Sequence, residues 1–146
     1  MSGSTGTLLI SLHAFATLGM MGVAWFVQLV HYPLFDRAER DRFQDFEREH
    51  QRRTGWVVGP LMLAELGTSV ALAGFPPAAV SRAVAATALG AVVALWLSTW
   101  LVQVPLHRRL ASGFDEDTHR RLVATSWLRT VLWTARGCWA AWLVTA

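Results

Sequence analysis

Residues 8–30 read LLISLHAFATLGMMGVAWFVQLV, and this stretch decides the fold. It contains no charged residue. A helix that rises about 1.5 Å per residue crosses the roughly 30 Å of bilayer hydrocarbon in about 20 residues, so this segment is long enough to span a membrane. Because it lacks a basic start and a small-residue cleavage site, we interpret it as a retained span rather than a signal peptide.

Three further segments of the same kind follow, at residues 56–75, 84–104 and 122–144. Hydrophobic residues make up 53% of the chain, and the mean hydropathy is +0.35. Both values are high for a soluble domain. We therefore predict an all-α fold, in which residues 1–146 form a single transmembrane domain built as an integral membrane four-helix bundle.

The basic residues are all arginines, and most of them lie in two loops, residues 31–54 and 105–121. The first loop holds Arg37, Arg40, Arg42, Arg48, Arg52 and Arg53, and the second holds Arg108, Arg109, Arg120 and Arg121. Arginine-rich loops stay in the cytoplasm, so we expect a bacterial-type inner membrane protein with both loops inside and both termini outside. The sequence pI of about 10.4 reflects these loops, and no nucleic-acid partner is expected.

The two halves of the chain resemble each other. Residues 25–29 (WFVQL) match residues 100–104 (WLVQV), and residues 54–56 (TGW) match residues 125–127 (TSW). Each half contains two predicted spans, so two copies would share one orientation and be related by an axis along the membrane normal. The pattern predicts a pseudo-duplicated pair of tandem helical hairpins. The alternative is that the two hairpins are unrelated and resemble each other only because membrane hairpins in general place tryptophans at interfaces and arginines in inside loops.

The first arginine-rich loop has a helical pattern. Phe43 and Phe46 recur among alternating charges, and Asp45 stands three residues before Arg48. Such a spacing supports ion pairs along a helix, and a helix with an aromatic face lies at a membrane surface. We therefore predict an amphipathic surface helix in the first cytoplasmic loop.

Ionisable side chains occur deep within the predicted spans. Glu65 and Arg136 fall near the middle of the second and fourth spans, at equivalent positions of the repeat, so we expect an ion pair. Arg129 stands one to two turns nearer the cytoplasm. One carboxylate does not neutralise two guanidinium groups, so these three residues would line a cavity for an anionic or hydrogen-bonding ligand. The alternative is a pair that only joins two helices.

Gln28 and Gln103 occupy matching positions near the cytoplasmic ends of the first and third spans. Each shares a helical face with a tryptophan and a histidine, which is His31 in the first span and His107 in the third. We predict that both glutamines bind the ligand and that both histidines are candidate catalytic residues, because imidazole exchanges protons near neutral pH. An interfacial aromatic belt with polar ends is the alternative.

Several histidines lie at the cytoplasmic boundary. These are His31, His50, His107 and His119. With a loop carboxylate such as Glu47 or Asp117, they would offer suitable ligands to a metal ion. No HxxH or HExxH spacing supports such a site, so it remains an alternative, and neither a metal site nor a cofactor is predicted. Cys138 is the single cysteine, which excludes internal disulfides and dithiol chemistry.

Two motifs carry a family resemblance. Residues 103–110 (QVPLHRRL) close the third span, and residues 127–130 (WLRT) open the fourth. These stretches resemble the Val-Pro-Leu-Asn-like and Trp-x-Arg-Thr-like motifs of the anthrone-oxygenase-like family of small four-helix membrane proteins. The resemblance implies a four-helix bundle and oxidation of a polycyclic phenol, with His107 and Arg129 at the motif positions. His107 stands where the family has an asparagine.

These features predict an integral membrane protein that binds a hydrophobic, aromatic ligand within the bundle and has an oxygenase or other oxidoreductase activity. Glu65, Arg129 and Arg136 would orient polar groups of the ligand. The alternative is a non-catalytic membrane subunit or scaffold whose intramembrane polar residues lock helix packing. The expected partners are the lipid bilayer, a hydrophobic small molecule, and further copies of the chain or a larger membrane complex.

Overall fold

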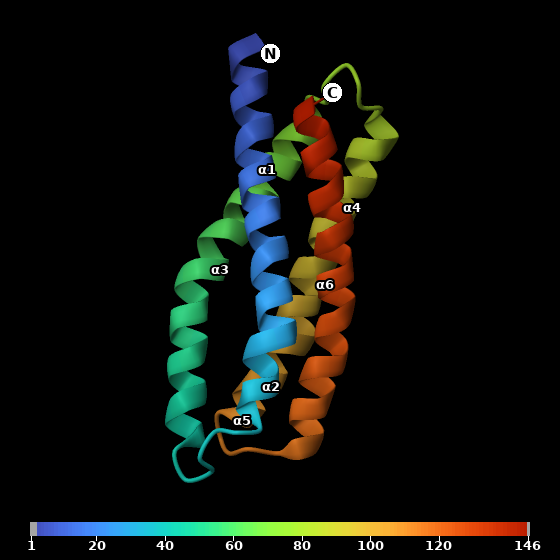
Figure 1. The fold of residues 1–146 in the computed structure, drawn as a ribbon. Coiled ribbons are helices and arrows are strands. Elements are labelled where there is room, and N and C mark those ends of the chain that lie inside the picture. The colour runs from blue at the N-terminus through green and yellow to red at the C-terminus, as the bar shows by residue number, and fades with distance from the viewer. Residues whose placement is uncertain (1–2, 146) are drawn as a thin grey trace.

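The computed structural model describes residues 3–145, and every regular element in that part of the chain is a helix. The long helices are α1 (Gly3–Phe26), α3 (Phe43–Gly74), α4 (Arg82–Ser98) and α6 (Glu116–Thr145). The shorter elements are the π-helical segments η1 (Val27–His31) and η2 (Thr99–Gln103) and the short helices α2 (Tyr32–Phe35) and α5 (Val104–Leu110). The long helices form a bundle in which α1 and α4 each pack against α3 and α6 (Figure 1). The prediction of an all-α fold is confirmed.

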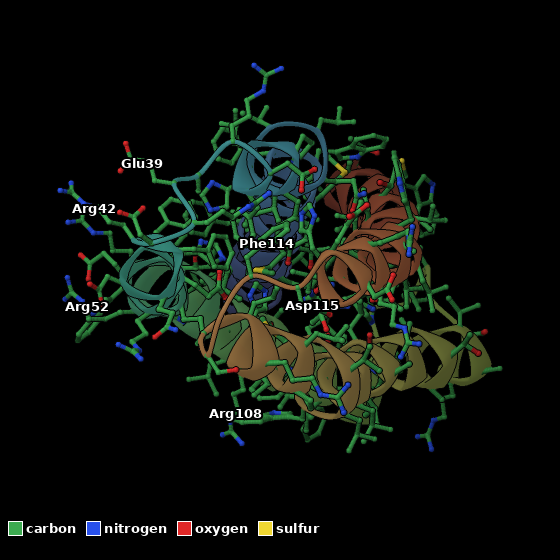
Figure 2. All side chains as sticks on the ribbon, turned by 90° about the horizontal axis from the view of Figure 1, so that it is seen from below. Glu39, Arg42, Arg52, Arg108, Phe114 and Asp115 are labelled. Carbon is green, nitrogen blue, oxygen red and sulfur yellow. The ribbon has the colours of Figure 1, made fainter. Side chains whose placement is uncertain are left out.

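The connections divide between the two ends of the bundle. Both ends of the described chain and the α3–α4 turn lie at one end, and the α2–α3 and α5–α6 turns lie at the other (Figure 1). Seen from below, Arg42, Arg52 and Arg108 point outward from this second end, whereas Phe114 lies between the two turns (Figure 2). We call it the arginine end, because the arginine-rich segments gather there.

A proline explains each π-helical segment. Pro33 and Pro105 have no backbone N–H, and their rings crowd the carbonyl four residues earlier, so neither fits a regular α-helix. The N–H groups of the preceding residues, Tyr32 and Val104, each donate to the carbonyl five residues back. The widened turn keeps the chain helical up to the proline and redirects the side chains that follow.

The same order of elements recurs in the two halves: a long helix, a π-helical segment, a short helix with a proline, a turn and a second long helix. Pro33 and Pro105 set the register of the two halves at an offset of 72 residues, whereas Gln28 and Gln103 are 75 residues apart. The two glutamines are therefore offset by three residues from the register that the prolines give, although the match between residues 25–29 and 100–104 pairs them directly.

Residues 43–53 are helical but do not form a separate surface helix. They are the first turns of α3, which continues without interruption to Gly74. Asp45 and Arg48 pair on the exposed side of this segment, while Phe43 and Glu47 are fully buried. The predicted helix with an exposed charged face is present, but it is the start of α3, and its face with Phe43 and Glu47 packs into the bundle.

The long helices differ in polarity. The stretches that are long and apolar enough to cross a membrane are Ser4–Phe35, Phe43–Gly74 and Arg82–Leu110. The remaining long helix, α6, has 30 residues and is more polar. Its polar side chains, such as Thr130 and Arg136, are buried in the bundle, while Leu128 and Val131 are 68% and 61% exposed. The polar face of α6 therefore points inward, which is the reverse of a soluble amphipathic helix.

Gly137 lies where α6 crosses α1. A Cβ atom at this position would lie 2.6 Å from the Sδ atom of Met21 and 3.5 Å from its Cβ atom. Small residues at helix crossings let membrane helices pack closely through van der Waals contacts. The close contact between α1 and α6 therefore depends on having glycine, which has no side chain, at position 137.

We expect Gly137→Leu to lower the midpoint of thermal unfolding in detergent, because overpacking a tight contact costs about 1–3 kcal/mol. Gly67→Leu is the matched control, since a new Cβ at Gly67 meets nothing within 4 Å. Equal midpoints for the two variants would show that the crossing tolerates a side chain.

Asp115 caps the first turn of α6. Its Oδ2 atom accepts a hydrogen bond from the Thr118 backbone N–H at 2.8 Å. Hydrogen bonds from the Thr118 hydroxyl and N–H lower the pKa of the Asp115 carboxyl below its ordinary value. Because the folded-state pKa is lowered, the stability contributed by the ionised cap is present above the ordinary pKa and is lost as the pH falls through the lowered value.

We expect Asp115→Ala to speed hydrogen exchange at the Thr118 amide, because a free N–H at a helix start is left without its acceptor. Asp115→Asn keeps a side-chain oxygen and should retain most of the protection, without its loss at acid pH. Equal protection in wild-type protein and Asp115→Ala, after correction for intrinsic exchange, would contradict the cap.

Candidate functional site

An internal cavity of about 130 Å³ lies between the long helices, toward the arginine end. Its polar lining consists of Tyr32, His50, Thr54, Thr99, Gln103, His107, Ser126 and Arg129. Apolar residues such as Met20, Val58 and Trp133 complete the wall. The redirected segments after the π-helical turns supply Tyr32 and His107, so the prolines help to shape the site.

Arg129 contributes a cation to the cavity, and no carboxylate of residues 3–145 forms an ion pair with it. Its Nε atom is buried and has no hydrogen-bond partner in the described part of the chain. The guanidinium lies over the Trp133 ring, 4.9 Å from the ring centroid. This cation–π contact offsets only part of the cost of removing the charge from water. The arrangement therefore favours an anionic or oxygen-bearing ligand beside Arg129.

Tyr32, His107 and Glu47 form a hydrogen-bonded chain at the cavity wall. The Tyr32 hydroxyl lies 3.1 Å from Nε2 of His107, and Nδ1 of His107 lies 2.6 Å from Oε1 of Glu47. The Gln51 amide donates to the same Glu47 oxygen and to the backbone carbonyl of His107, both at 3.1 Å. This chain provides a path for a proton between the cavity and a buried carboxylate.

His31 and His50 meet beside this chain. Nε2 of His31 lies 2.7 Å from Nδ1 of His50, which also lies 3.1 Å from the Thr54 hydroxyl. The rings of His50 and His107 have centroids 5.3 Å apart. Three of the four boundary histidines singled out in the sequence therefore come together at the arginine end.

His119 lies apart from this group. Its Nδ1 is 3.1 Å from an oxygen of Asp36, and its Nε2 is 2.9 Å from the backbone carbonyl of Tyr32. These contacts occupy both ring nitrogens, so His119 links α6 to α2. Asp117 pairs with Arg120 on the exposed surface. The alternative metal site would require His119, or Asp117, to lie beside the other histidines. Neither residue belongs to that group.

Aromatic side chains close the bundle at the arginine end. Phe35 and Phe43 are fully buried with ring centroids 5.9 Å apart, and Phe43 meets Phe114 at 4.9 Å. We call these three residues the aromatic floor. The Arg40 guanidinium lies over the Phe114 ring, 3.4 Å from its centroid. The floor helps to shield Glu47 from water, which strengthens the hydrogen bonds that this carboxylate accepts.

A lateral groove of about 470 Å³ runs between α1 and α3, next to the cavity. Most of its lining is apolar, for example Phe26 and Val57. The residues that line both the groove and the cavity are Val23, Val27, His50, Thr54 and Val58. The groove and the cavity therefore adjoin each other along these residues.

Glu65 and Arg136 form an ion pair farther from the arginine end, as the sequence predicts. Nε of Arg136 donates to Oε1 of Glu65 at 3.0 Å, and the other guanidinium nitrogens donate to the Ala88 carbonyl and the Ser69 hydroxyl. The Trp133 indole N–H donates to the second Glu65 oxygen at 3.1 Å. Each charged group is thus satisfied by described residues. The geometry favours the packing alternative for this pair over ligand binding.

The two predicted glutamines have different surroundings. Gln103 lines the cavity and donates to the Thr125 hydroxyl at 3.0 Å. Gln28 donates to the Val123 carbonyl at 3.3 Å and is not among the residues that line the cavity. Both Oε1 atoms are buried without a hydrogen-bond partner in residues 3–145. Of these two side chains, Gln103 is the one positioned to contact a ligand.

The sequence prediction omits Tyr32 and names Glu47 only as one of two loop carboxylates. A signal for Glu47 is present, because Glu47 and His50 form a Glu-x-x-His spacing, which places both side chains on one face of a helix. Tyr32 is the single tyrosine of the chain and precedes Pro33. The Tyr32 side chain lines the cavity because of the π-helical turn, and the sequence pattern does not predict that turn.

We expect Arg136→Met to destabilise the protein by about 3–5 kcal/mol, because it leaves the Glu65 carboxylate buried and uncompensated. The double substitution Glu65→Leu with Arg136→Met should recover much of this loss, since it removes both charges. Denaturant unfolding in detergent measures both. Arg48→Met is the control, because its pair with Asp45 is exposed and should contribute little. A single Arg136→Met variant as stable as wild type would show that the pair is dispensable.

Comparison of the chain with models of protein families, with curated proteins and with solved structures finds no match. The resemblance to the anthrone-oxygenase-like family therefore rests on the two sequence motifs that contain His107 and Arg129. The function has to be inferred from the chemistry of the cavity and from the surface of the bundle.

Proposed function

We propose that the chain is a four-span membrane protein that binds a hydrophobic molecule through an oxygen-bearing aromatic ring, which enters the internal cavity and is held by Arg129. The observation that carries the proposal is the unpaired, buried Nε of Arg129 beside the Trp133 ring. Tyr32 and Gln103 line the same cavity. Guanidinium groups bind phenolate, carboxylate and carbonyl oxygens through charge-assisted hydrogen bonds.

The volume of the cavity limits what can enter it. An apolar cavity of about 150 Å³ holds a benzene ring. The cavity here, at about 130 Å³, is suited to a single substituted ring. The remaining rings of a polycyclic phenol, or the tail of a single-ring molecule, would lie in the lateral groove of about 470 Å³.

The outer surface of the bundle supports insertion by all of its long helices. Leu8, Phe15 and Leu101 are each 70% exposed, and the outward face of α6 is also apolar at Leu128 and Val131. Extended apolar surfaces of this kind mark contact with lipid or with another protein. With the arginine end in the cytoplasm, the positive-inside rule orients both termini outward across a bacterial-type inner membrane.

His107 is the proton acceptor of the proposed site. Ionisation of a phenolic hydroxyl releases a proton, and the chain from the Tyr32 hydroxyl through His107 to Glu47 supplies hydrogen-bonded groups to receive it. His31 contacts His50 and lines the groove rather than the cavity. We therefore assign the first proton transfer to His107 and a supporting position to His31.

The non-catalytic scaffold explains part of the polar interior. It accounts for Glu65 and Arg136, whose hydrogen bonds are complete. It supplies no reason for a second arginine whose Nε atom is buried, because Arg129 joins no helix through an ion pair in the described chain. Ligand binding accounts for the second arginine as well.

We expect Arg129→Met to weaken binding of a dodecyl-substituted para-benzoquinone by about ten- to a hundredfold, because a hydrogen bond to a charged group contributes about 1.5–3 kcal/mol. Partitioning of the quinone between empty and protein-loaded lipid nanodiscs measures the affinity. Dodecylbenzene, which has no oxygen, should bind more weakly and show no difference between the two proteins.

Arg108→Met is the matched control for this measurement. Arg108 is exposed at the arginine end, so its loss removes a charge without altering the cavity. Wild-type affinity for the quinone in Arg129→Met, or equal loss in both variants, would overturn the proposed role of Arg129.

A further inference from the structure

We infer that Glu47, His50 and His107 form a binding site for a divalent first-row transition metal ion at the wall of the internal cavity. One potential ligand atom from each residue lies within 4.8 Å of the other two. Glu47 and His50 come from one turn of α3, and His107 comes from α5, so both hairpins contribute. Two imidazoles and one carboxylate suit ions such as Zn²⁺, Fe²⁺ or Co²⁺ better than Mg²⁺ or Ca²⁺.

Each histidine is oriented through the nitrogen that the metal would not use. Nδ1 of His50 lies 2.7 Å from Nε2 of His31, which leaves Nε2 of His50 for the metal. Nε2 of His107 lies 3.1 Å from the Tyr32 hydroxyl, which leaves Nδ1 for the metal. Metal-binding histidines have such outer partners, which fix the ring and its tautomer. The arrangement is therefore already that of an oriented pair of ligands.

Glu47 supplies an unsatisfied anionic oxygen. The residue is fully buried, and its Oε2 atom has no hydrogen-bond partner within residues 3–145. Its Oε1 atom accepts from Gln51 at 3.1 Å and lies 2.6 Å from Nδ1 of His107. Tetrahedral metal bonds of about 2.1 Å place neighbouring ligand atoms roughly 3.4 Å apart. Binding would therefore separate His107 from Glu47 slightly and draw together the other ligand atoms, which lie within 4.8 Å of one another. The ion would replace the proton that now joins His107 to Glu47.

A site with three protein ligands keeps a coordination position open. His50 and His107 both line the cavity, together with Tyr32 and Arg129. The open position therefore faces the space proposed for the oxygen-bearing ring. The metal site does not depend on the Arg129 contact, because Arg129 is not one of its ligands. A metal ion on Nδ1 of His107 would take the place of proton transfer from His107 to Glu47.

Metal titration of the chelator-treated full-length protein in detergent tests the inference. We expect one Zn²⁺ per chain, and Co²⁺ should give visible d–d absorption bands that Zn²⁺ displaces. His31→Gln removes only an outer partner and should weaken Zn²⁺ binding by about ten- to a hundredfold. Glu47→Gln, His50→Gln and His107→Gln each remove a ligand and should weaken it more.

Two control variants leave all three proposed ligands in place. His119→Gln removes a buried imidazole outside the group and should bind Zn²⁺ as the wild type does. Arg129→Met should also keep Zn²⁺ binding, so that a failure of the ligand proposal is distinguishable from a failure of the metal site. Unchanged affinity in all three ligand variants would overturn the inference, and so would a wild-type protein that binds neither Zn²⁺ nor Co²⁺.

A measurement on the wild type alone decides the matter if the ligand variants lose their helical circular dichroism spectrum. Bound Cu²⁺ should show nitrogen couplings from two imidazoles by electron paramagnetic resonance. A Cu²⁺ spectrum without nitrogen coupling would overturn the site.

Discussion

The buried ion pair between Glu65 and Arg136 sets how α6 is rotated in the bundle. Arg136 reaches Glu65 and Ser69 on α3 and the Ala88 carbonyl on α4, so one side chain joins three helices. Arg129 lies seven residues earlier, about two helical turns, and therefore shares the inward face of Arg136. The ion pair of Arg136 with Glu65 thus also turns Arg129, two turns away on α6, toward the inside of the bundle.

The inward orientation of the polar side chains is what bilayer hydrocarbon would favour, and the apolar outer surface suggests that environment. In hydrocarbon, an apolar face gains little by being buried, whereas an unpaired polar group is costly. Polar side chains therefore collect between the helices, where His13 meets Thr68 at 3.0 Å and Gln103 meets Thr125. The polar composition of α6 and the burial of side chains such as Thr130 and Arg136 are consistent with this cause.

The helices were predictable because predominantly apolar stretches of about 20 residues have few other stable forms in a membrane. The pairing of Glu65 with Arg136 was predictable from the depth of both residues in their predicted spans and is confirmed by the 3.0 Å hydrogen bond. The helix at residues 43–53 was predictable from the charge spacing, but that spacing does not reveal that the helix continues through α3 or that Phe43 and Glu47 face the bundle. The arrangement of side chains within the site could be predicted less well.

Three physical reasons limit what the sequence predicts about the site. Which arginine is satisfied depends on the Ala88 carbonyl, a backbone group contributed by another helix. Which histidines meet depends on Asp36, which holds His119 away from the others. The position of Tyr32 depends on a π-helical turn whose extra residue rotates everything after it. Each is a property of packing rather than of local pattern.

The lateral groove between α1 and α3 has a consequence for how tightly the cavity must bind. Its wall is mostly apolar and it adjoins the cavity along shared residues such as Val23 and Val58, so in a bilayer a ligand would arrive from among the acyl chains. A hydrophobic molecule dissolved in lipid is far more concentrated there than in the surrounding water. Modest intrinsic affinity then suffices to fill the site, and occupancy follows the mole fraction of ligand in the membrane.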